Sequence, residues 1–158
     1  MQAIKFHELQ WIRDDSWQRS YRLRAGMRDL LALRWSHERG LNASAEARRR
    51  RWNFLCIGYL SKQVIVQSPN HALPLAIFKQ GALRFTDGRV YRLKHTSPLC
   101  IAAEWQDGQG RPLLRLNVES GAVEMCQKPA SGALYDTALL IALGWYLLMS
   151  MHLDMQMV

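Results

Sequence analysis

The chain has 158 residues, 49% of them hydrophobic and 22% charged, which indicates one globular domain over residues 1–158 and excludes a disordered chain. Its three cysteines, Cys56, Cys100 and Cys126, form no CxxC pair, and this odd number argues against a secreted disulfide scaffold. The net charge of +8 is unevenly distributed along the chain. Residues 1–98 carry 18 basic and 7 acidic side chains (+11), whereas residues 99–158 carry 3 basic and 6 acidic side chains (−3). The excess of basic residues favours anionic partners.

Hydrophobic residues from about residue 17 to residue 126 recur with a period of two, in short runs between turn residues. Tyr91 and Leu93, for example, alternate with Arg92 and Lys94. This pattern indicates antiparallel strands with one buried face. The predicted strands cover, in chain order, residues 17–23, 31–35, 52–56, 62–67, 73–79, 82–85, 90–94, 101–105, 114–116 and 122–126. Residues 1–16 and 40–47 receive no predicted strand.

The number of strands predicts a closed barrel. Ten short strands in one open sheet would leave long unpaired edges, whereas closure removes those edges. We therefore predict an all-β fold, a closed antiparallel barrel of roughly ten to twelve strands. A ring of ten or more strands is too wide for its own side chains to meet, so an apolar element must fill the lumen.

The pattern changes near the C-terminus. Residues 137–153, TALLIALGWYLLMSMHL, have no charged side chain when His152 is neutral, and their apolar residues occupy every face of a helix. With Asp136 as the predicted N-cap, the helix covers about residues 136–153. A helix that is apolar on all sides must be enclosed by protein or by lipid.

Length distinguishes these two environments. Seventeen helical residues span about 25 Å, less than the roughly 30 Å of a bilayer core, whereas a strand of seven residues is about 23 Å long. The helix therefore matches the depth of the barrel, and we predict that it fills the lumen. A tail anchor with residues 137–153 in the bilayer is the alternative. Gly144 either allows a barrel strand to approach closely or only lowers helix propensity, and the second interpretation needs no further explanation.

The most distinctive chemical feature is the run of four arginines that precedes Trp52. Guanidinium groups bind phosphate oxygens bidentately, and Trp52 could insert at a lipid interface. If Trp52 instead begins a strand's inward-facing row of side chains, the arginines lie in solvent at the end of the barrel. We predict an anion-binding or lipid-binding site on this basic surface. The predicted binding residues are Arg48, Arg49, Arg50, Arg51 and Lys62.

Other chemistries lack a motif. The sequence has no paired zinc ligands, no GxSxG elbow, no glycine-rich phosphate loop and no nucleic-acid-binding module. His95, Glu104 and Asp107 would suggest an enzyme if a cleft gathered them. We therefore expect no catalytic activity, no metal or cofactor and no specific nucleic-acid partner. The N-terminal residues show no signal peptide, so we expect a cytoplasmic protein, peripheral at the inner membrane face.

Three segments carry a resemblance to a known superfamily. DGRVYRLKHTS (87–97), EWQDGQGRPLLRL (104–116) and LLIALGWYLLM (139–149) occur in this order. Over about residues 17–153 the chain resembles bacterial proteins of unassigned function that are related to the Tubby C-terminal domain, the LURP-one-related proteins and the phospholipid scramblases. The resemblance implies a closed barrel threaded by a hydrophobic C-terminal helix. It also implies membrane association, which in Tubby involves phosphoinositide headgroups, but it assigns no binding residue in this chain.

Overall fold

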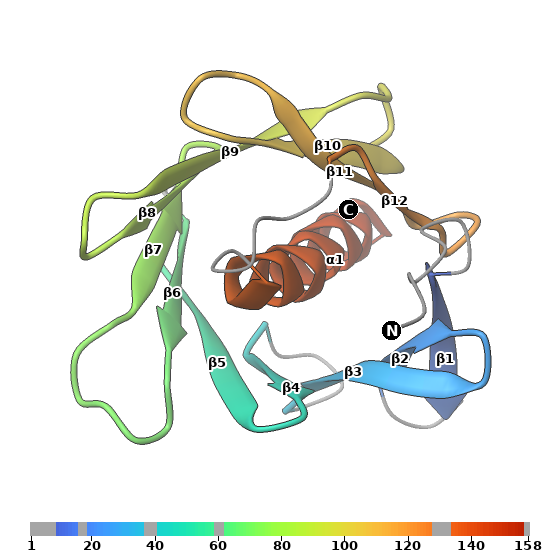
Figure 1. Ribbon diagram of the computed structural model, residues 1–158, viewed down its shortest axis with the longest axis horizontal. Coiled ribbons are helices and arrows are strands. Elements are labelled where there is room, and N and C mark those ends of the chain that lie inside the picture. Colours follow the sequence, from blue (N-terminus) through green and yellow to red (C-terminus); the bar gives the residue numbers. More distant parts are fainter. Residues whose placement is uncertain (1–8, 16–18, 37–40, 59–61, 128–133, 157–158) are drawn as a thin grey trace.

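A computed structural model of the chain describes residues 9–15, 19–36, 41–58, 62–127 and 134–156. Twelve antiparallel strands, each hydrogen-bonded to the next in chain order, form a near-closed barrel around α1 (Leu134–Gln156) (Figure 1). The strands are β1 (Leu9–Asp15), β2 (Ser20–Ala25), β3 (Arg28–Trp35), β4 (Ala43–Ala47), β5 (Arg50–Ile57), β6 (Gln63–Gln67), β7 (Ala76–Lys79), β8 (Ala82–Phe85), β9 (Val90–His95), β10 (Ala102–Gln106), β11 (Pro112–Asn117) and β12 (Val123–Met125). The predicted barrel with a C-terminal helix is confirmed.

Ten strands coincide with predicted runs, and β1 and β4 were missed. In β1 the alternation of buried and exposed residues gives way to Arg13, Asp14 and Asp15, which end the period of two. In β4 the inward positions are alanines, Ala43 and Ala45, which are too small to mark a hydrophobic row. Strand pairing on both sides, and not intrinsic preference, makes β4 a strand. Trp17, where the first predicted run begins, lies outside the described residues.

Two-residue turns connect three of the hairpins. The first turn residue has a positive φ in each case, 62° at Gly26, 38° at Arg48 and 52° at Gln80. Because consecutive strands are antiparallel, successive connections alternate between the two ends of the barrel. The β2–β3 and β4–β5 turns therefore lie at the same end, and the β7–β8 turn lies at the other.

The barrel closes between β1 and β12. Within the described part of the chain a single bridge, between Gln10 and Ala122, joins these strands, and the Trp11 amide donates to the Gly121 carbonyl over 2.8 Å. Gly121 has a φ of 77°, and a Cβ there would lie 2.7 Å from the Trp11 carbonyl oxygen. A glycine at position 121 is thus required both by its φ and by the close approach of β1.

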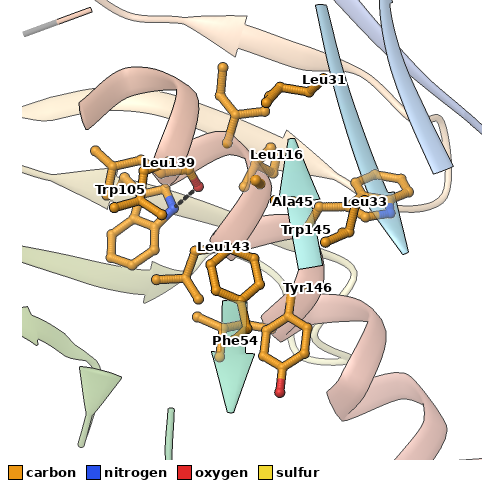
Figure 2. Close-up of a cluster of buried hydrophobic side chains, with 14 of the residues drawn as sticks. Leu31, Leu33, Ala45, Phe54, Trp105, Leu116, Leu139, Leu143, Trp145 and Tyr146 are labelled. Carbon is orange, nitrogen blue, oxygen red and sulfur yellow. Dashed lines mark hydrogen bonds between the residues drawn. The ribbon is translucent and has the colours of Figure 1, made fainter. Parts of the chain in front are cut away.

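The core is the surface between the barrel and α1. Every residue from 139 to 148, apart from Gly144, is a buried hydrophobic residue, so all faces of this part of the helix are enclosed by protein. Figure 2 shows Leu143 and Tyr146 among side chains from the surrounding strands. Trp145 stacks on Trp11 with ring centroids 5.2 Å apart, and Tyr146 lies 5.2 Å from Phe54. The prediction that the helix fills the lumen is confirmed, with bounds of 134–156 in place of 136–153.

Across the described ranges, no helix has both the length and the apolar character needed to span a membrane.

Gly144 marks the closest approach of the helix to the barrel wall. The Trp105 indole Nε1 donates a hydrogen bond to the Leu140 carbonyl over 2.7 Å (Figure 2). A Cβ on Gly144 would lie 2.7 Å from this Nε1 and 2.2 Å from Leu116 Cδ1. The interpretation that Gly144 only lowers helix propensity is therefore wrong, because the residue makes room for β10 and β11 to contact α1.

Candidate functional site

Arg48 and Arg49 form the two-residue turn between β4 and β5, and both are exposed. Arg51 lies opposite Glu46 in the strand register, and their side chains form an exposed ion pair of 3.5 Å. No hydrogen bond or ion pair joins Arg48 or Arg49 to another residue that the structure describes. The turn therefore presents two guanidinium groups to solvent at one end of the barrel.

Trp52 points into the barrel. It is 3% exposed and belongs to the hydrophobic core, in register with Ala45 of β4. The strand pleat places successive side chains on opposite faces, so an inward Trp52 requires an outward Arg51. Trp52 thus cannot insert at a lipid interface, and its role as the start of an inward-facing row is the correct alternative.

Lys62 lies far from the four arginines. It precedes β6, whose first residue, Gln63, pairs with Ile57 at the end of β5. Because Arg51 is at the start of β5, six residues away from Ile57, about 20 Å of strand separates the two positions. The structure does not bring Lys62 together with Arg48–Arg51.

The neighbouring β2–β3 hairpin contributes residues that the sequence interpretation missed. Met27 is 102% exposed at its tip, directly after Gly26 and directly before the exposed Arg28. The Arg28 side chain has no ion pair or hydrogen bond to the rest of the described chain. β3 pairs with β4, so the β2–β3 and β4–β5 hairpins are adjacent. We call Met27, Arg28, Arg48 and Arg49 the basic tip.

A groove of about 670 Å³ runs over the outer face of β2–β5 beside the basic tip. Four arginines and three carboxylates line it, so its net charge is +1 (4 minus 3). The charged lining residues are Arg22, Arg34, Arg48, Arg51, Asp14, Asp29 and Glu46. Arg22 binds Asp14 and Asp29 over 3.0 Å each, and hydrogen bonds from Arg24 and Arg22 lower the pKa of Asp29. Internal ion pairs therefore neutralise most of this groove.

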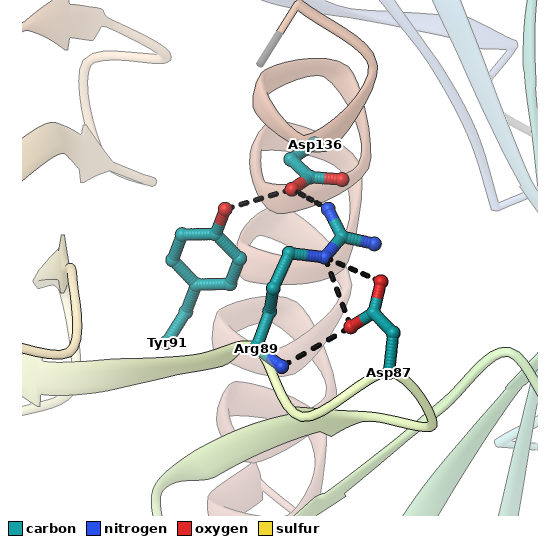
Figure 3. A network of polar contacts seen from close by, with 4 residues as sticks. All are labelled: Asp87, Arg89, Tyr91 and Asp136. Atoms are coloured by element: carbon teal, nitrogen blue, oxygen red, sulfur yellow. Dashed lines mark hydrogen bonds and ion pairs between the residues drawn. The ribbon is translucent and has the colours of Figure 1, made fainter. Parts of the chain in front are cut away.

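A polar network joins the start of α1 to the β8–β9 hairpin (Figure 3). The Asp136 carboxylate accepts hydrogen bonds from Arg89 Nη1 and, over 2.7 Å, from the Tyr91 hydroxyl. Burial and then the hydrogen bond to Asp136 raise the pKa of Tyr91 to about 12, so the phenol stays a donor. Because α1 begins at Leu134, Asp136 lies in the first turn of the helix and not at the predicted N-cap. The network fixes the helix in the barrel.

The acid and base candidates do not form a common site. Glu104 accepts from Gln106 over 2.8 Å and from Arg115 over 3.0 Å, and these bonds lower its pKa. Asp107 accepts from the backbone amides of the β10–β11 turn, and His95 lies at the end of β9. In the portion of the chain described, no three His, Cys, Asp or Glu residues are arranged to hold a metal ion.

Comparison with known protein families, with curated proteins and with solved structures found no match to this chain. The twelve-stranded barrel with its internal helix agrees with the fold that the Tubby-like resemblance implies. Membership of that superfamily stays a prediction.

Proposed function

We propose that the protein is a non-catalytic, cytoplasmic peripheral protein that binds anionic lipid at the inner membrane face through the basic tip. One observation carries the proposal: an apolar side chain that is 102% exposed, Met27, stands at the tip of one hairpin, flanked by arginines of that hairpin and the next. An apolar anchor with surrounding cations is the combination that favours the interface of an anionic membrane.

The expected affinity is modest. Burying a methionine side chain contributes about 1.5–3 kcal/mol, and each arginine near an anionic surface adds about 1 kcal/mol. With Arg28, Arg48 and Arg49 the sum is about 5 kcal/mol, which gives weak and reversible attachment. The electrostatic part decreases as salt screens the charges. Binding should therefore be strongest at low ionic strength.

The backbone of Arg48 supports a role outside the fold. Its φ of 38° lies in the left-handed region, which glycine adopts without strain and which Gly26 occupies in the neighbouring hairpin. No hydrogen bond or ion pair of the Arg48 side chain with another described residue compensates for this strain. Strained residues of this kind concentrate at functional sites.

Arg48→Gly is expected to stabilise the fold while weakening lipid binding. Glycine relieves the strain of the left-handed conformation, but it also increases the conformational entropy of the unfolded chain. The net result is a rise of about 0.5–1 kcal/mol in the free energy of unfolding. Urea denaturation measures this gain, and vesicle co-sedimentation measures the loss of binding. A variant that is less stable than the wild type, or that binds vesicles equally well, would contradict this use of Arg48.

The direct test is co-sedimentation of the full chain with phosphatidylserine–phosphatidylcholine vesicles and with pure phosphatidylcholine vesicles at low salt. We expect preferential binding to the anionic vesicles, a marked decrease for Arg49→Glu and a decrease for Met27→Ser. Arg34→Glu is the matched control, because it reverses the same charge near the end of β3 (Arg28–Trp35) that lies away from the basic tip. Equal sedimentation with both vesicle types, or an equal decrease for Arg34→Glu and Arg49→Glu, would refute the proposal.

A further inference from the structure

A second groove, of about 530 Å³, lies on the outer face of β7, β8 and β9. Its charged lining residues are Lys79, Arg84 and Arg92, and its net charge is +3 because no carboxylate lines it. The larger groove over β2–β5 has a net charge of only +1. Of these two grooves, the one over β7–β9 therefore carries more uncompensated positive charge.

The strand register places the three cations around one small residue. Ala82 of β8 pairs with Lys79 of β7 on one side and with Arg92 of β9 on the other. Strands are about 4.8 Å apart, so the backbones of Lys79 and Arg92 are separated by about 10 Å with alanine between them. Arg84 follows two residues after Ala82 on the same face, about 7 Å along the strand. Ala82 itself is only 2% exposed, so it forms the floor of the groove between the longer side chains of its neighbours.

The protein itself does not neutralise this charge. No ion pair or hydrogen bond links the side chains of Lys79, Arg84 or Arg92 to any residue in the described ranges. The nearest acidic residues along these strands, Asp87 and Glu104, already bind other arginines. Three like charges so close together repel one another, and a bound anion would relieve that repulsion.

Neutral donors complete the lining. The side chains of Gln63, Gln80 and Thr86 also border the groove. Gln80 has a positive φ of 52° in the tight β7–β8 turn, a conformation that is uncommon for glutamine. Ile77 is the most exposed of the apolar lining residues, and at 37% exposure it offers no protruding anchor like Met27. A concave, basic wall without an apolar tip suits a soluble anion better than a membrane surface.

We propose that this groove is a binding site for the phosphate group of a small soluble molecule. Arg84 and Arg92 bind phosphate oxygens through their guanidinium groups, Lys79 adds a point charge, and the amides and hydroxyl provide further donors. The site is separate from the basic tip and binds a different kind of ligand, so it extends the proposed function and does not depend on it.

The test is an NMR titration of the full chain with inorganic phosphate and with pyrophosphate at constant ionic strength, using chloride as the reference anion. We expect saturable shifts of backbone amides in β7–β9 and tighter binding of pyrophosphate. Arg84→Gln and Arg92→Gln should each weaken binding about tenfold, because each removes a charge-assisted hydrogen-bonding group. Arg34→Gln, the same change on the opposite wall, should leave the affinity unchanged.

Several results would overturn the proposal. These are shifts that do not saturate, shifts that chloride reproduces, and affinities that Arg84→Gln and Arg92→Gln leave unaltered. Co-sedimentation of the same variants with phosphatidylserine vesicles separates the two proposals. If Arg84→Gln and Arg92→Gln reduced sedimentation as strongly as Arg49→Glu, the groove would be part of a membrane-binding surface. It would then not be a site for a soluble ligand. The basic-tip variants are expected to bind phosphate with wild-type affinity even if they lose binding to vesicles. The two proposals can therefore fail independently.

Discussion

Leu143→Asp is expected to abolish folding. Leu143 is 0% exposed and lies on α1 within the barrel, among apolar side chains of the helix and the strands. A carboxylate there would have no partner, and an isolated charge in such an environment costs several kcal/mol in addition to the lost apolar contacts. This loss is comparable to the whole stability of a typical domain, about 5–15 kcal/mol. Far-UV circular dichroism and urea denaturation would show the loss of the cooperative transition.

Leu73→Asp is the matched control for this experiment. Leu73 is 79% exposed in the loop between β6 and β7, so the same chemical change should alter the free energy of unfolding by less than about 0.5 kcal/mol. A Leu143→Asp protein that unfolded cooperatively at a wild-type urea concentration would show that the helix is not enclosed by the barrel.

Gly144→Ala is expected to destabilise the protein, although the same change stabilises an ordinary exposed helix by about 1 kcal/mol. The new Cβ would overlap Leu116 Cδ1 and the Trp105 indole nitrogen, at 2.2 and 2.7 Å. The helix must then move away from β10 and β11, which strains the core and weakens the buried hydrogen bond from Trp105 to the Leu140 carbonyl. The combined loss is about 2–3 kcal/mol in urea denaturation.

A double-mutant cycle identifies the cause. Leu116→Ala removes the atom nearest to the added Cβ, so Gly144→Ala should cost less in that background than in the wild type. An unchanged cost would mean that the contact with Leu116 is not responsible. A stabilised Gly144→Ala single variant would restore the simpler interpretation, in which the glycine only lowers helix propensity.

The sequence predicts the architecture well because two simple periods encode it. The period of two in ten strands and the apolar residues on every face of α1 are local features, and together they require a filled barrel. The two missed strands lack this signal, since β1 ends in charged residues and β4 buries only alanines at Ala43 and Ala45. The helix begins two residues before the predicted start, and the partners of Asp136, Arg89 and Tyr91, could not be predicted because they are distant in sequence.

The candidate sites are less accessible to sequence interpretation. The Arg48–Arg51 run is visible as letters, but whether Trp52 faces inward depends on the register with β4. Lys62 is separated from that run by the length of β5. The second groove gathers Lys79, Arg84 and Arg92 from three strands, and no local spacing marks them as a group. Met27 lies beside a recognisable glycine turn, but its full exposure is known only from the structure.

The place of α1 after all twelve strands has a consequence for biosynthesis. A ribosome releases the strands first, so their apolar inner faces emerge before the element that covers them. During that interval the apolar inner faces of the strands are not covered by α1, and the nascent chain is prone to association with other chains or to binding by chaperones. Completion of the native barrel must therefore wait until α1 has also left the ribosome.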